Sequence, residues 1–158
     1  MRFNLIVAGV SAICAIAIVA PIERADAAGR TRTAQSKLAS DPEFSVKGRI
    51  VVERREATRK APERETLELS LSRMRAGETY TIWMDDPFDD SDLVVRTPPY
   101  DILPRPTRKA VVRFVSGTAQ GLPFGGTLAD LASRRVQVRN AAGKVVVVGT
   151  VPAIRRPR

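Results

Sequence analysis

The chain contains no histidine, and its only cysteine, Cys14, lies in an apolar N-terminal segment. Without an imidazole, Ser-His and Cys-His nucleophilic systems and histidine proton shuttles are excluded. If the N-terminal segment is removed, no thiol remains, which also excludes disulfide bonds within one chain. Ligation of zinc, copper, haem or iron–sulfur clusters by nitrogen or sulfur side chains is then excluded as well.

Other catalytic motifs are missing too. No Ser-x-x-Lys tetrapeptide is present, and Gly121, Gly125 and Gly126 do not have the spacing of a dinucleotide-binding loop. The Asp-Thr-Gly and Asp-Ser-Gly signatures of aspartic proteases are absent. The sequence therefore predicts a protein that is not an enzyme and has no cofactor, with a carboxylate-based hydrolase as the remaining enzymatic alternative.

The first 27 residues have the layout of a secretory signal peptide. Arg2 precedes an apolar run over residues 5–20, and Ala25-Asp26-Ala27 supplies the small-x-small cleavage pattern. The run is shorter than the roughly 20 residues that span a hydrocarbon core, so an uncleaved anchor is the weaker alternative. We expect an exported protein, periplasmic or secreted, with no stable membrane span after cleavage.

The charge is strongly one-sided, with 26 Lys and Arg against 17 Asp and Glu and a net charge of +9 at pH 7. A surface of this kind attracts anionic polymers such as lipopolysaccharide, acidic glycans or nucleic acid. The simpler alternative is that the basic residues keep a β-rich domain soluble and protect its edge strands.

Apolar residues after the signal segment recur with the period of β-strands. Residues 28–42 are mostly small or polar, which predicts a flexible linker, and the domain is expected to cover residues 43–153. The first strand is indicated by Phe44, Val46, Ile50 and Val52, which share one parity. The charged residues 53–65 predict a mobile loop or a solvated hairpin end.

Further strands follow at short intervals. Leucines alternate with polar residues over 67–71, and strands are expected at 79–84, at 93–97 before Pro98-Pro99, and at 109–116. Residues 135–139 and 144–151 predict a hairpin across 140–143, and residues 128–133 a single helical turn. Because residues 145–148 are apolar on both faces, we expect a closed or two-layered architecture.

About seven strands with short turns predict an all-β fold, either a small antiparallel β-sandwich or a barrel. Residues 154–158 form a basic tail. We consider a non-catalytic envelope or secreted module, with a structural or macromolecule-binding role, the first functional hypothesis. Its partner would be a protein or an anionic polymer, and a polyanion-binding protein is the alternative. The candidate polyanion-binding residues are Arg54, Arg55, Arg59, Lys60, Arg64, Arg155, Arg156 and Arg158.

Two further sets of residues could make contacts. Trp83 has the parity opposite to Tyr80, Ile82 and Met84, so it faces a partner if those three face the core, although the reverse orientation is also open. The proline-rich stretch with Tyr100 and Arg105 predicts a stiff loop that either contacts a partner or connects two sheets.

An acidic cluster between residues 85 and 92 offers several hard oxygen ligands. A calcium site there would use Asp86, Asp90 and Asp92, although the order does not match an EF-hand loop. A solvated acidic turn is the other interpretation, and the sequence favours it.

Overall fold

A computed structural model describes residues 29–89, 91, 93–104 and 107–154. The predicted signal peptide and the arginines of the basic tail lie outside these residues. Strands make up most of the described chain, which confirms the predicted all-β class but not the predicted sandwich or barrel. Its elements are β1 (Thr31–Ser40), β2 (Lys47–Arg55), β3 (Arg64–Ser72), β4 (Tyr80–Asp85), β5 (Val94–Ile102), β6 (Lys109–Val115), η1 (Pro123–Gly125), α1 (Leu128–Leu131), β7 (Arg135–Asn140) and β8 (Val145–Thr150).

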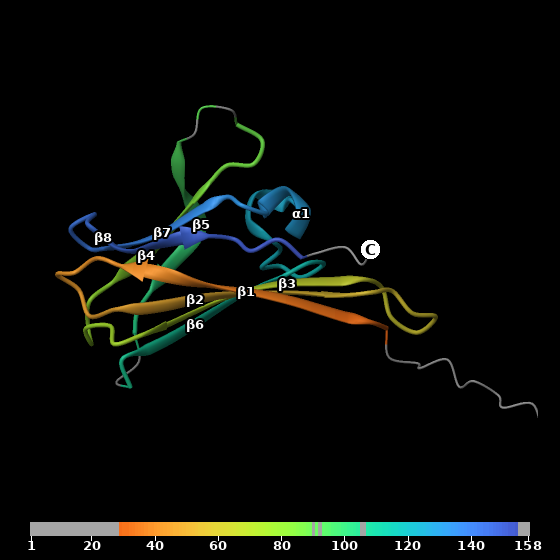
Figure 1. The fold of residues 1–158 in the computed structure, drawn as a ribbon, viewed down its shortest axis with the longest axis horizontal. Coiled ribbons are helices and arrows are strands. Elements are labelled where there is room, and N and C mark those ends of the chain that lie inside the picture. The colour runs from red at the N-terminus through yellow and green to blue at the C-terminus, as the bar shows by residue number, and fades with distance from the viewer. Residues whose placement is uncertain (1–28, 90, 92, 105–106, 155–158) are drawn as a thin grey trace, which may run out of the picture.

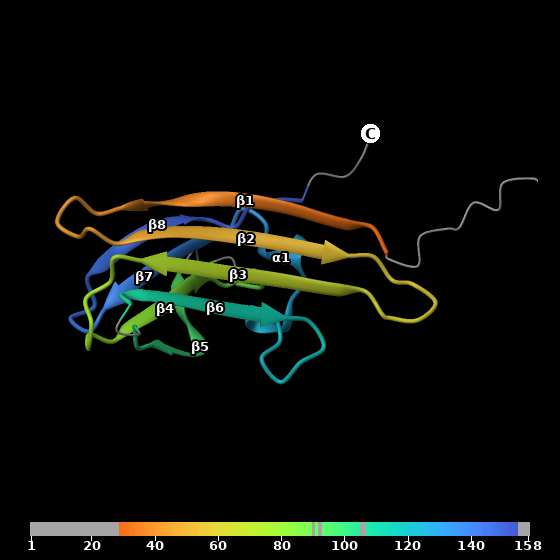
Figure 2. The same cartoon turned by 90° about the horizontal axis from the view of Figure 1, so that it is seen from below.

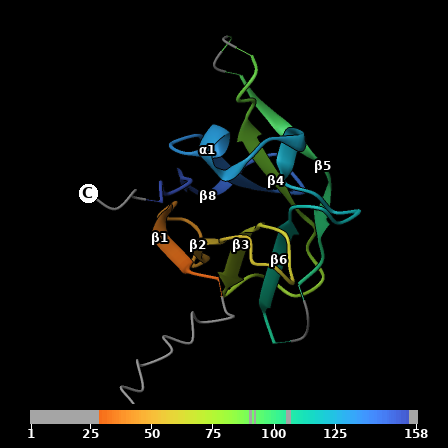
Figure 3. The same cartoon turned by 90° about the vertical axis from the view of Figure 1, so that its right-hand side faces the viewer.

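All eight strands belong to one antiparallel sheet in the order β5-β4-β7-β8-β1-β2-β3-β6. The sheet curls into a half-barrel, and Figure 3 shows β1, β2, β3 and β6 on one side and β8, β4 and β5 on the other. Strand β1 belongs to both halves, because residues 31–38 pair with β2 whereas Ala39 and Ser40 pair with β8 (Figure 1). The architecture is thus one curled sheet, neither two separate sheets nor a closed barrel.

The concave side of the sheet holds the core. In β3 the alternation is complete, with Leu67, Leu69 and Leu71 buried while the residues between them are half-buried. Each such leucine stabilises the fold by about 1.5–3 kcal/mol relative to an exposed position. The predicted burial of Val46, Ile50 and Val52 is confirmed, but the strand begins only at Lys47, and Phe44 is half-buried ahead of it. The other strands contribute Ile50, Val52, Tyr80, Ile82, Met84, Phe114, Val136, Val138, Val146 and Val147.

Strand β1 corrects the prediction of a flexible linker over residues 28–42. It pairs with β2 along eight positions, from Thr31 opposite Arg55 to Leu38 opposite Gly48. The sequence hid this strand because its inward positions are mostly small or polar, as at Ala34 and Ser36. Backbone pairing with β2 holds most of its length in place, and Leu38 is the one residue of β1 that is buried in the core.

Strand β5 corrects a second boundary. The prediction ended this strand at Thr97, but β5 continues through Pro98 and Pro99 to Ile102. Proline is tolerated in β5 because this is an edge strand, paired only with β4. The register against β4 shifts between Thr81 and Trp83, which accommodates the prolines.

The connections between strands agree more closely with the sequence-based predictions. Residues 53–65 form a solvated hairpin end, with β2 and β3 paired as far as Arg55 opposite Arg64. The predicted hairpin of β7 and β8 is confirmed, and Gly143 adopts a φ of +78° in its turn. The expected helical turn is α1, which places Leu128 and Leu131 in the core. Strand β6 ends the sheet and pairs with β3 alone among the described strands, and Figure 2 shows it alongside β3.

Candidate functional site

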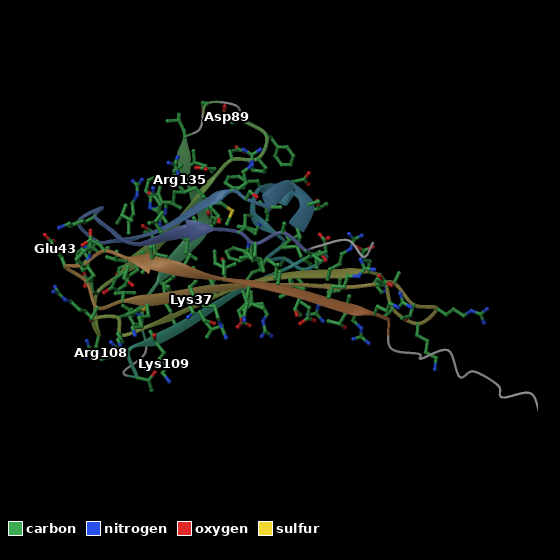
Figure 4. The ribbon with its side chains drawn as sticks, viewed as in Figure 1. Lys37, Glu43, Asp89, Arg108, Lys109 and Arg135 are labelled. Atoms are coloured by element: carbon green, nitrogen blue, oxygen red, sulfur yellow. The ribbon has the colours of Figure 1, made fainter. Side chains whose placement is uncertain are left out.

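The convex side of the β1-β2-β3-β6 half carries an outer basic surface, which we define as Lys37, Lys47, Arg49 and Lys109. The strand register sets these residues in two adjacent rows. Lys37 lies opposite Arg49, which lies opposite Ser70. In the next row, Lys47 and Lys109 flank Ser72. Four cations from three strands therefore share one end of this face, and Figure 4 labels Lys37 and Lys109.

The hydrogen-bonding groups of this surface point to solvent. All four cations are exposed, whereas the Ser70 and Ser72 side chains between them are half-buried. A shallow hollow over the surface is lined by Lys37, Lys47, Arg49, Lys109 and both serines, among others. Strand spacing separates residues on adjacent strands by about 5 Å and alternate residues of one strand by about 6.7 Å. The ammonium, guanidinium and hydroxyl donors are therefore close enough for one anionic group to contact several of them.

The outer basic surface is not neutralised by neighbouring acids. Among the described residues, none of its four cations has a carboxylate within ion-pair distance. Lys37 and Arg49 lie directly opposite each other, and like charges in that position destabilise a sheet. The surface therefore has a positive electrostatic potential, which attracts anions.

Glu68 and Arg113 lie opposite each other on β3 and β6, in the row of residues next to Arg49 and Ser70. Arg113 Nε donates a hydrogen bond to Glu68 Oε2 at 3.1 Å. This bond, assisted by one from Ser70 and by the charge of Arg49, lowers the pKa of Glu68 despite the opposing effect of desolvation. The carboxylate of Glu68 is thus already bound by Arg113.

The predicted arginine-rich loop lies at the far end of the β2–β3 hairpin. There Arg54 pairs with Glu63, and its Nε lies 3.8 Å from Glu65 Oε1. The hydrogen bond and charge of Glu63 raise the Arg54 pKa. Arg55, Arg59, Lys60 and Arg64 are exposed, but they share this hairpin end with four glutamates, at 53, 56, 63 and 65. The loop is therefore closer to neutral than its arginines suggest.

The tail arginines of the same prediction, Arg155, Arg156 and Arg158, lie outside the described residues.

The signal that could have found the outer basic surface is strand parity. Lys47 and Arg49 have the parity opposite to Ile50 and Val52, but Lys37 and Lys109 join them only through the register of four strands.

Trp83 takes the outward orientation of the two that the sequence left open. Tyr80, Ile82 and Met84 are buried, whereas Trp83 is half-buried on the convex side. Its Nε1 donates a hydrogen bond to Thr81 Oγ1 at 2.8 Å, and the Arg139 guanidinium carbon lies 4.1 Å from the ring centroid. Gln137 accepts two hydrogen bonds from Arg139 and holds it there. The indole is therefore covered by a neighbour from its own sheet.

The other predicted contact residues are only partly described. Tyr100 belongs to β5, but its side chain lies outside the described part, as does Arg105. Of the proposed calcium ligands, Asp90 and Asp92 are likewise outside. Asp86 Oδ1 accepts a hydrogen bond from the Phe88 backbone N–H at 2.8 Å, as expected of an acidic turn. Among the residues that the structure describes, no group of three or more acidic side chains could hold a metal ion.

Within the described residues, no helix has the length and apolar character needed to cross a membrane. No protein-family model, curated protein or solved structure matches this chain.

Proposed function

We propose that this chain is a non-catalytic exported module that binds an anionic polymer through its outer basic surface. The observation that carries the proposal is the group of four exposed cations, Lys37, Lys47, Arg49 and Lys109, without an acidic partner among the described residues. The absence of histidine from the sequence supports a binding role over catalysis. The N-terminal signal pattern supports a location in the cell envelope or outside the cell.

The chemistry of the surface suits repeated anionic groups. Lysine is a compact point charge, while the guanidinium of Arg49 presents planar donors that match phosphate, sulfate or carboxylate. The hydroxyls of Ser70 and Ser72 add neutral donors between them. None of the four defining residues is aromatic, which favours backbone or head-group contacts over recognition of individual bases.

Binding of this kind depends on salt, because each neutralised anion releases a counterion. On double-stranded DNA the logarithm of the affinity falls with the logarithm of salt concentration by about 0.9 per contact. We therefore expect the protein to bind heparin, lipopolysaccharide and double-stranded DNA tightly at low salt, and more weakly at physiological salt.

The decisive experiment compares two variants that lose the same charge. One is Lys37→Gln/Lys47→Gln/Arg49→Gln on the outer basic surface, and the control is Arg55→Gln/Arg59→Gln/Lys60→Gln at the hairpin end. On DNA, the first variant should lower the salt slope by up to about 2.7, since three contacts at about 0.9 each are removed. The control should keep a slope near that of the unmodified protein.

Heparin and lipopolysaccharide are then used to identify the preferred class of polymer. Equal loss of binding in both triple variants would show that net charge alone causes the attraction. Absence of binding to all three polymers at physiological salt would also overturn the proposal.

A further inference from the structure

Strand β6 ends the sheet and offers a free edge. It pairs with β3 from Val115 opposite Thr66 to Lys109 opposite Ser72. On its other side no described strand is paired with it, because β5, the opposite end of the curled sheet, pairs only with β4. A free edge of this length presents a row of unpaired backbone donors and acceptors.

Hydrogen bonds at both ends of β6 show which backbone groups face that edge. The Ser116 N–H donates to the Glu65 C=O at 2.9 Å, and the Met74 N–H donates to the Arg108 C=O at 3.1 Å. In an antiparallel ladder the groups of alternate residues point to opposite sides, so the even-numbered residues of β6 bond to β3. The N–H and C=O groups of Lys109, Val111 and Arg113 therefore point away from β3.

A groove lies beside this edge, between β6 and the end of β5. Ile102 and Leu103 line it from the β5 side, and Lys109, Val111 and Arg113 line it from the β6 side. Leu103 is 67% exposed and Val111 is 63% exposed, and both are among the most exposed large apolar side chains of the described chain. An apolar contact is therefore available next to the unpaired backbone groups.

The charges along the β6 edge indicate which kind of strand can pair with it. Lys109, Val111 and Arg113 are exposed on the convex face, so the edge has the pattern cation, apolar, cation. Arg113 is also paired with Glu68 on β3, whereas Lys109 has no ion pair among the described residues. A second copy paired antiparallel with Val111 at the centre would set Lys109 of each chain opposite Arg113 of the other, and such like-charge pairs are destabilising. A strand with acidic side chains on both sides of an apolar one has the complementary pattern.

We propose that the free edge of β6 binds an extended acidic segment of a partner protein, which adds to the sheet as an antiparallel strand. Backbone hydrogen bonds to Lys109, Val111 and Arg113 provide the attachment, and side chains at alternate positions provide the selectivity. The site differs from the one under Proposed function in its ligand and its surface, and only Lys109 belongs to both.

The test uses the full-length protein and a fluorescent, end-blocked heptapeptide, TETVTET, whose central valine is designed to lie opposite Val111. Binding is followed by fluorescence anisotropy. Val111→Pro removes the edge-facing N–H without touching the β3 ladder, whereas Val111→Thr keeps it. We expect Val111→Pro to weaken binding by about tenfold or more, and Val111→Thr to change it far less. The reversed-charge peptide TKTVTKT should bind poorly.

A charge swap tests the same site without proline. In an antiparallel pair the sixth residue of the peptide lies opposite Lys109, so Lys109→Glu should prefer TETVTKT over TETVTET. The variant Lys37→Gln/Lys47→Gln/Arg49→Gln should still bind TETVTET, so failure of polymer binding and failure of strand addition are distinguished.

Three results with the peptides would overturn the proposal. They are equal affinity of the unmodified protein for the two charge-reversed peptides, unchanged peptide preference in Lys109→Glu, and undiminished binding to a folded Val111→Pro variant. Self-association of the protein that Val111→Pro abolishes would assign the edge to a second copy instead.

Discussion

The carboxylate of Glu65 accepts a hydrogen bond from the backbone N–H of Leu128 at 3.0 Å, across 63 positions of the chain. Glu65 is only 8% exposed, and its own backbone exchanges hydrogen bonds with Ser116. Leu128 begins α1, whose first backbone N–H groups have no partner within the helix. Glu65 thus joins the start of β3 to the helical segment that covers one end of the core.

Replacement of Glu65 by alanine should destabilise the fold. The Leu128 N–H would lose its partner in a buried position, which costs about 1–3 kcal/mol. The matched control is Glu63→Ala on the same hairpin, where an exposed ion pair with Arg54 is lost at a cost of at most about 1 kcal/mol. Urea denaturation measures both, and equal losses would contradict a special role for Glu65.

Trp83 is the only tryptophan, so its fluorescence reports directly on the stacked pair with Arg139. Arg139→Gln should raise the acrylamide quenching of Trp83 and lower the free energy of unfolding by about 0.5–1 kcal/mol. Arg96→Gln is the control, because Arg96 lies opposite Trp83 on β5 but is paired with Asp101. If both variants gave the same quenching, the cover over the indole would not come from Arg139.

The Glu68–Arg113 pair should make stability depend on pH in a definite direction. Because Arg113 lowers the pKa of Glu68 below its ordinary 4.5, the pair contributes stability above that value and loses it as pH falls through the folded-state pKa. Urea unfolding should therefore show Glu68→Gln less stable than the unmodified protein at neutral pH, with the difference shrinking in acid. In an Arg113→Gln background, the stability difference between Glu68 and Glu68→Gln should depend little on pH. A persistent pH dependence would mean that a group other than Arg113 lowers the pKa of Glu68.

Thr97 carries the one buried side-chain oxygen without a hydrogen-bond partner among the described residues. Its hydroxyl therefore contributes a desolvation cost with no compensating bond, and Thr97→Val should leave stability unchanged or raise it by about 1–2 kcal/mol. Thr81→Val is the contrast, since the Thr81 hydroxyl accepts a hydrogen bond from Trp83 and its loss should destabilise. A thermal melt of the two variants decides, and a clear loss of stability in Thr97→Val would contradict the prediction.

Much of the strand pattern could be read from local sequence, because burial on one face imposes a period of two. The leucines of β3 and the hairpin of β7 and β8 are examples. Strand β1 could not be found in this way, since its inward Ala34 and Ser36 carry no apolar signal. The prolines of β5 were misleading for a related reason, because only its place at the sheet edge makes them acceptable.

For the candidate surfaces, too, local sequence predicted less than the strand register decided. Sequence proximity drew attention to the arginines of residues 54–64, but cross-strand neighbours place acids among them. The outer basic surface was missed, because its cations are separated by up to 72 positions in the chain, from Lys37 to Lys109. Its existence depends on the register that joins β1, β2, β3 and β6.

By itself, the sequence determined that this chain is an all-β domain and that histidine and thiol chemistry are missing from residues 28–158. Those properties follow from composition and from local periodicity, which need no knowledge of distant contacts. The tertiary structure decided that one sheet curls instead of splitting into two, that Trp83 lies under Arg139, and that β6 is a free edge. Each of these depends on strand order, and strand order results from backbone pairing between segments far apart in the chain.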